Sequence, residues 1–172
     1  MTSDLIKRIV WFFFFAVAQA IMLGRIHLFG YATPLFYVYF VAMFPLNYPK
    51  WGVLLWSFLL GLVIDTFSNT PGLTSASLTL IAAIQPYYFQ LFVPRDSAET
   101  LEPSLTNLGR TKYAYYIVTL VLFYCMVFFT LELFNFFDVM EWALYVVTST
   151  LITLMLIYTI EEAADIINHG KQ

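Results

Sequence analysis

Residues 51 to 77 read WGVLLWSFLLGLVIDTFSNTPGLTSAS, and this stretch decides how the chain is organised. An apolar run reaches one carboxylate, Asp65, breaks at the polar sequence NTPG, and resumes at once as a second apolar run. Thr70 followed by Pro71 is typical of a helix start, because a hydroxyl can cap the helix and proline lacks an N–H that would stay unpaired. The stretch therefore predicts two long apolar helices joined by a tight turn, with an acid close to that turn.

The composition is typical of an integral membrane protein. Of the 172 residues, 61% are hydrophobic, 20% are aromatic and only 11% are charged, so the chain cannot cover a soluble domain with a polar shell. The net charge of −3 is spread along the chain, which argues against a nucleic-acid partner. A single cysteine, Cys125, lies inside an apolar run and excludes an intramolecular disulfide. We expect the lipid bilayer to surround most of the surface.

Six apolar segments predict an all-α integral membrane protein with one membrane domain over residues 1–172. The segment at 35–46 is short: about twelve residues make a helix of roughly 18 Å, against roughly 30 Å of hydrocarbon. It either spans the membrane with the help of tilt or forms a re-entrant hairpin with the next segment, and we favour six transmembrane helices. The expected spans are 9–29, 35–46, 51–67, 73–92, 113–137 and 139–160, with a polar loop at 93–112.

Basic residues predict the orientation of these spans. With six spans and an inner N-terminus, seven of the eight Lys and Arg residues face the cytoplasm, and only Arg25 lies outside. This asymmetry predicts that the N and C termini are both cytoplasmic. The seven inner residues are Lys7, Arg8, Lys50, Arg95, Arg110, Lys112 and Lys171.

The first segment also has features of a signal peptide, because Lys7-Arg8 precedes an apolar run and the small-residue sequence Ala18-Gln19-Ala20. The apolar character continues through residues 21–23, and no polar region precedes the possible cleavage site. We therefore expect a retained helix.

Small residues recur every four positions on one face of the first helix, at Ala16, Ala20 and Gly24. Such spacing lets a second helix approach closely, which is how helices associate inside a bilayer. The stripe is a candidate face for a partner helix, and internal packing within the bundle is at least as consistent with it.

Asp65 is the candidate functional residue of the turn. In the structural interpretation its carboxylate accepts N–H bonds from the start of the next helix, around Gly72 to Ser75, whose positive end favours a negative charge. The alternative is a proton or cation site. Arg25 could also form an ion pair with Asp65 or with Glu132, and the sequence does not select between them. No second acid or histidine lies at helical spacing from Asp65, so we favour a structural lock of the turn formed with Thr70, Pro71 and Gly72.

Several enzyme classes lack their motifs in this sequence. There is no G-x-S-x-G nucleophile turn, no H-E-x-x-H, no phosphate-binding loop and no pair of intramembrane aspartates. His27 has no second histidine within helical reach, which argues against a metal site. We expect a protein that is not an enzyme and that binds no cofactor.

The residues around the turn carry a family resemblance. The segment order, the short proline-flanked second segment, and the sequence GLVID at 61–65 followed by SNTPGL at 68–73 resemble the bacterial rod shape-determining protein MreD family. In that family a G-x-x-x-D run leads into a small turn with glycine and then another helix. The likeness covers the layout of most of the chain, and individual residues from 34 to 92.

The resemblance implies a non-enzymatic scaffold subunit of the cell-shape and elongation machinery in the bacterial cytoplasmic membrane, which supports peptidoglycan synthesis. Relatives bind the bitopic protein MreC directly, and through it reach the MreB cytoskeleton, RodA and a class B penicillin-binding protein. The family is also similar in fold to the substrate-binding subunits of energy-coupling-factor vitamin transporters. A small-molecule-binding transport subunit is therefore the alternative, but the outer loops at 66–72 and 137–141 look too short to cap a vitamin.

Overall fold

The computed structural model describes residues 2–25, 33–93, 103–132 and 139–169, and this part of the chain contains helices and loops but no strand. Helices α3, α6 and α7 contain stretches that are long and apolar enough to cross a membrane, and α1 has a shorter apolar stretch, Arg8–Gln19. The structure is compatible with the predicted all-α membrane protein. The helices are α1 Thr2–Arg25, α2 Val38–Ala42, α3 Lys50–Ser68, α4 Leu73–Gln90, α5 Leu105–Leu108, α6 Arg110–Glu132 and α7 Val139–His169.

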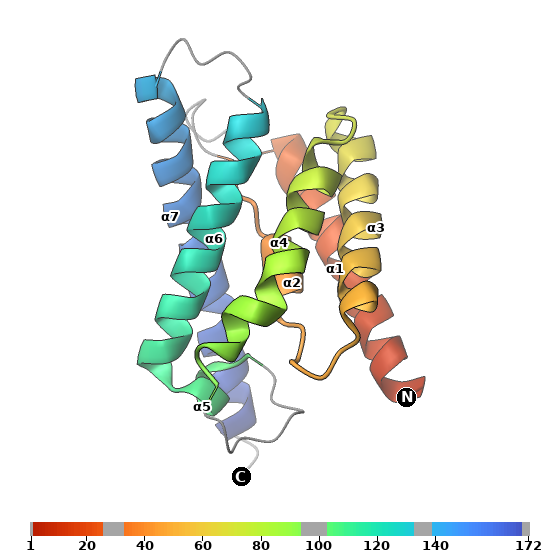
Figure 1. Ribbon diagram of the computed structural model, residues 1–172, viewed down its shortest axis with the longest axis vertical. Helices are drawn as coiled ribbons and strands as arrows, with labels where there is room; N and C mark the ends of the chain where they lie inside the picture. The colour runs from red at the N-terminus through yellow and green to blue at the C-terminus, as the bar shows by residue number, and fades with distance from the viewer. Residues whose placement is uncertain (1, 26–32, 94–102, 133–138, 170–172) are drawn as a thin grey trace.

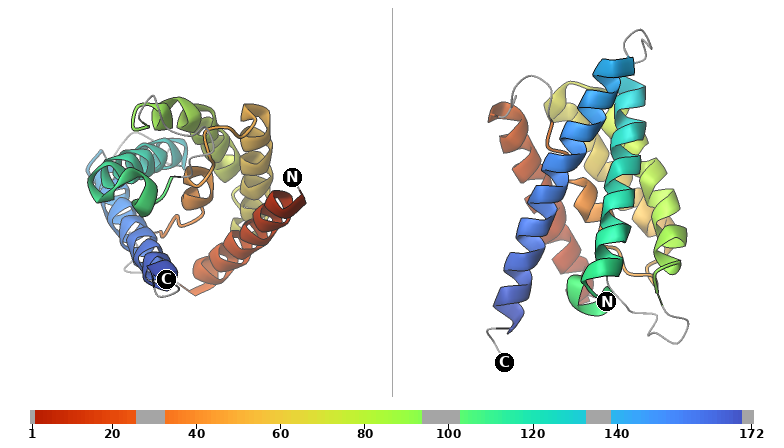
Figure 2. Two further views of the ribbon diagram at one scale, coloured as in Figure 1. Left: turned by 90° about the horizontal axis from the view of Figure 1, so that it is seen from below. Right: turned by 90° about the vertical axis from the view of Figure 1, so that its left-hand side faces the viewer.

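The long helices stand side by side around the short helix α2 (Figure 1). α1 packs on α3, α3 on α4, α4 on α6 and α6 on α7, while α2 contacts α1, α3, α4 and α6. Seen along the bundle, α2 lies inside an arc of helices (Figure 2). Along this arc the helices follow one another in the order α1, α3, α4, α6 and α7. The start of α1 and the end of α7 lie at the same end of the bundle (Figure 1).

The segment predicted as a helix over 35–46 is helical only at Val38–Ala42. Its side chains are almost completely enclosed: residues 35–42 and Phe44 each expose 4% or less of their surface. The segment descends through the middle of the bundle to the start of α3 (Figure 1). Backbone that is not helical is tolerated at membrane depth when protein surrounds it, which is why this segment needs no full-length helix.

Aromatic side chains hold the central segment to the helices around it. The ring of Phe15 on α1 lies 5.0 Å from that of Phe36 and 5.9 Å from that of Phe40, measured between centroids. On the other side, the ring of Tyr37 meets that of Tyr124 on α6 edge-on at 5.8 Å. Edge-to-face pairs at such distances add stabilisation beyond the burial of their surface. The interior is therefore packed by the chain's own aromatic residues.

Candidate functional site

The carboxylate of Asp65 lies at the junction of α3 and α4 and is 96% buried, since only 4% of the residue is exposed. Its Oδ1 accepts the backbone N–H of Thr74 at 2.8 Å and the hydroxyl of Thr70 at 3.3 Å. Its Oδ2 accepts the backbone N–H groups of Ser75 at 3.0 Å and Gly72 at 3.2 Å. Both oxygens are thus occupied by donors from the turn and from the first turn of α4.

The side chain of Asp65 performs the capping that the sequence analysis expected from Thr70. The N-cap residue of α4 is Gly72, which has a left-handed backbone (φ 88°) and no side chain to cap with. The hydroxyl of Thr70 donates to Asp65 instead, so the expected N-cap at Thr70 is wrong. Because Asp65 accepts the second and third free N–H groups of α4, it satisfies donors that would otherwise be unpaired, and its charge meets the positive end of the helix.

Gly61 explains how the carboxylate comes within reach of α4. A Cβ atom built on Gly61 would stand 2.3 Å from the Cα of Ser75, so the backbones of α3 and α4 touch at this point. Gly61 lies one turn before Asp65 on the same helix face, which brings the N–H of Ser75 next to the acid. Asn69 ends α3 in the left-handed conformation (φ 56°), and the chain turns back here toward α4.

A second set of polar side chains satisfies the backbone of the central segment. At its start, the N–H groups of Thr33 and Leu35 donate to the hydroxyls of Ser149 and Thr153 on α7, at 3.2 and 3.1 Å. Opposite them, the amide of Gln19 on α1 donates to the carbonyl of Pro34 at 3.0 Å. The residues around Pro34 are therefore held between α1 and α7, and Ser149 and Thr153 on α7 serve hydrogen bonding within the bundle.

The other end of the central segment is held by α4 and α6. The side-chain amide of Gln85 donates to the carbonyl of Phe44 at 3.2 Å and to the hydroxyl of Tyr116 at 3.0 Å. Tyr116 in turn donates to the carbonyl of Ala42 at 3.1 Å. The carbonyl of Ala42 at the end of α2 and that of Phe44 just beyond it thus accept hydrogen bonds from buried side chains.

Two further buried contacts join the central segment to α6 and α7. The hydroxyls of Tyr37 and Tyr124 lie 2.7 Å apart, and the hydroxyl of Tyr39 donates to the carboxylate of Glu161. Sequence reasoning missed these residues, together with Gln19, Gln85 and Tyr116. The available signal was a single polar group within an apolar helix, which shows that a partner is needed but not which one.

The candidate partner face on α1 is only partly described. Ala16 is buried in the chain's own core, so at this position the small residue serves internal packing. Ala20 and Gly24 continue the helix, but their side-chain surroundings lie outside the described part of the structure, as does the side chain of Arg25.

Two cationic side chains on different helices, Arg8 on α1 and Lys50 at the start of α3, lie over aromatic rings. The guanidinium of Arg8 lies over the rings of Phe44 and Tyr48, at 4.6 and 4.1 Å from their centroids. The ammonium of Lys50 lies 4.2 Å from the ring centroid of Tyr87. Aromatic faces attract such cations, and long basic side chains are favoured at membrane–water interfaces.

The described residues contain no group of three His, Cys, Asp or Glu side chains that could hold a metal ion. Comparisons with known protein families, with curated proteins and with solved structures give no match for this chain.

Proposed function

We propose that this chain is a non-enzymatic scaffold subunit of the MreD type in the cytoplasmic membrane of a bacterium. In this role it binds an MreC-type bitopic protein, and through it supports peptidoglycan synthesis by RodA and a class B penicillin-binding protein along MreB. The proposal rests on the family resemblance of residues 34 to 92 and on the architecture that these residues adopt.

One observation favours a scaffold over a small-molecule carrier: the axis of the bundle is filled by the chain's own residues 35–44. A carrier needs a cavity with several converging polar groups at this place. Here the polar groups that converge on the axis, such as Gln19, Gln85 and Thr153, are engaged with the backbone of the central segment. Releasing them for a ligand would leave buried backbone groups unpaired, which is costly in a bilayer.

The bonding of Asp65 favours the same proposal. A cation or proton carrier needs a carboxylate that can exchange its partners, and intramembrane acids often serve that purpose. The carboxylate of Asp65 instead accepts four donors, two of them fully buried backbone N–H groups. The geometry supports a lock that fixes α3 against α4 and so gives the subunit a rigid surface.

We also propose that the chain crosses the membrane six times, with the central segment as the second crossing and both termini in the cytoplasm. The positions of the basic residues support this topology. Lys50, Arg110 and Lys112 lie in the first turns of α3 and α6, and Arg8 lies within the first two turns of α1. These three helices begin at the end of the bundle where α7 ends (Figure 1). Basic residues favour the cytoplasmic side of a membrane.

The test is co-purification. The tagged chain is expressed in its own bacterium, extracted in mild detergent, and the proteins that remain bound are identified by mass spectrometry. The proposal predicts that the MreC-type protein is recovered with it. Recovery of an ATP-binding energising module in its place would support the transport alternative and overturn the scaffold.

A matched pair of variants tests whether α1 contributes to the partner surface. Ala20→Leu should reduce recovery of the partner more than Val17→Leu, because close helix approach tolerates little added volume. Val17 is a suitable control since its side chain is exposed on the outer surface of α1. Gel filtration of both variants checks that each stays folded. Equal recovery of the partner with both folded variants would show that the small-residue stripe is not part of the assembly surface.

A further inference from the structure

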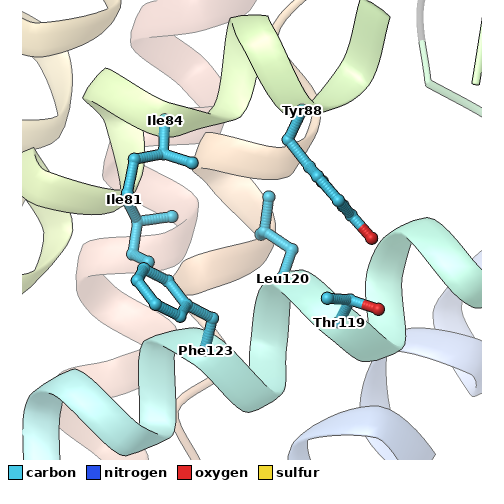
Figure 3. A pocket seen from close by; sticks show the side chains of 6 residues that line it. All are labelled: Ile81, Ile84, Tyr88, Thr119, Leu120 and Phe123. Carbon is cyan, nitrogen blue, oxygen red and sulfur yellow. The ribbon is translucent and has the colours of Figure 1, made fainter. Parts of the chain in front are cut away.

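An apolar groove of about 220 Å³ lies on the outer surface between α4 and α6 (Figure 3). Ile81 and Ile84 from α4 and Leu120 and Phe123 from α6 form its walls. Nearly all of its lining is hydrocarbon, and the groove opens away from the bundle, so a chain-like apolar ligand could enter it from the bilayer. Among the side chains that line it, those of Tyr88 and Thr119 carry a hydroxyl group.

These hydroxyls lie together at one end of the groove. In Figure 3 both oxygens point to the side on which α6 begins, away from Phe123. Threonines on helix surfaces in a membrane usually donate to the carbonyl four residues earlier. Thr66, Thr130 and Thr159 do so in this structure. Thr119 makes no such bond among the described residues, so its hydroxyl is available to a ligand at this end of the groove.

The face of α6 that borders the groove changes in polarity along its length. Lys112, Tyr115, Thr119 and Phe123 follow at spacings of three or four residues and therefore share one face of the helix. Lys112 is exposed, and Tyr115 exposes 66% of its surface. The rise from Lys112 to Thr119 is roughly 10 Å, which leaves room for a headgroup between the ammonium and the groove.

The order along this face is cation, aromatic phenol, hydroxyl and hydrocarbon. A glycerophospholipid has the complementary order: phosphate, glycerol ester oxygens and acyl chain. A lysine at the membrane surface attracts anionic headgroups, and tyrosine favours the interfacial layer in which ester groups lie.

We propose that the groove between α4 and α6 is a binding site for one anionic glycerophospholipid. An acyl chain occupies the groove between Ile84 and Phe123, the hydroxyls of Thr119 and Tyr88 donate to ester oxygens, and the headgroup lies beside Lys112. This site is separate from the Asp65 turn and does not depend on the proposed scaffold role.

Native mass spectrometry of the detergent-purified chain tests the site. The protein is titrated with phosphatidylglycerol and with phosphatidylcholine that carries the same acyl chains. We expect one phosphatidylglycerol to bind about fivefold more tightly than phosphatidylcholine, because one lysine favours an anionic headgroup by about that factor. Lys112→Gln should remove this preference. Arg110→Gln should keep it, because Arg110 lies two residues away on another face of α6 and pairs with Glu162 at 3.1 Å.

Filling the groove tests the acyl-chain site separately from the headgroup. Ile84→Trp should weaken the binding of both lipids, whereas Leu59→Trp on α3 should leave it unchanged. Both residues are 41% exposed, but only Ile84 lines the groove. Thr119→Val should lower the affinity for both lipids about threefold, which is the effect of one hydrogen bond within a membrane.

Three outcomes would overturn the proposal. These are equal affinity of the wild-type chain for the two lipids, unchanged binding in Ile84→Trp, and a photocrosslinker at Ile84 that joins a polypeptide in cells. The last result would show that the groove holds a partner helix and not a lipid.

Discussion

Replacing Asp65 is the sharpest test of how α3 and α4 are held together. In Asp65→Leu the buried N–H groups of Thr74 and Ser75 lose their acceptors, and each unpaired donor costs about 1–3 kcal/mol. The loss of a negative charge at the start of α4 adds about 0.3–1 kcal/mol. An apolar side chain at a buried position offsets part of this cost. We therefore expect the free energy of unfolding to fall by about 2–4 kcal/mol.

Asp65→Asn should be less damaging, and the structure gives the reason. The amide oxygen can replace one carboxylate oxygen and keep its two donors, while the amide nitrogen faces the other two. About half of the hydrogen bonding is retained, so the expected loss is about 1–2 kcal/mol. The assay is unfolding in mixed micelles with increasing SDS, followed by helical circular dichroism. Glu162→Gln is the control: it removes a partly exposed carboxylate paired with Arg110, and should change stability by less than about 1 kcal/mol.

The order of the variants decides between a lock and a charge-dependent role. A lock predicts wild type as the most stable, then the Asn variant, then the Leu variant, with rescue of cell shape following stability. Wild-type stability in both variants, together with loss of rescue in both, would refute the lock and favour a role that needs the negative charge.

Three further predictions concern helix packing, the central segment and topology. Gly61→Ala should strongly destabilise the fold, because its Cβ would stand 2.3 Å from the backbone of Ser75. Gly52→Ala is the control, since its Cβ would meet the Tyr48 ring at 2.7 Å and this ring can move. Equal thermal stability of the two variants would contradict the close contact of α3 with α4. Gln85→Leu leaves the carbonyl of Phe44 unpaired and should lower the free energy of unfolding by about 1–3 kcal/mol. Gln90→Leu, at an exposed position of the same helix, should have little effect. Similar losses in both variants would argue against the hydrogen bond between Gln85 and Phe44. Reporter fusions at residue 102 and at the C terminus should both read cytoplasmic, and a periplasmic signal at either place would exclude the six-crossing topology.

The turn shows how far local sequence can specify a site. An acid at the end of one apolar run, four residues after a glycine, predicted N–H bonds to the next helix, because a buried charge must find donors. The donors at Gly72, Thr74 and Ser75 agree with that expectation. The exact capping residue did not follow, because Thr-Pro is a favourable helix start in isolation, whereas here Asp65, seven residues before Gly72, takes the capping role.

The sequence by itself determined the helical, apolar character of the chain and the presence of an acid near a tight turn. Composition and the length of apolar runs suffice for this, since they depend on local propensity and on transfer into lipid. Only the tertiary structure decided the path of residues 33–44. A short apolar segment between prolines suits a tilted span or a re-entrant hairpin, and sequence reasoning favoured the span. The choice depends on whether distant helices supply hydrogen-bond partners, and here Gln19, Gln85 and Thr153, from three different helices, supply them.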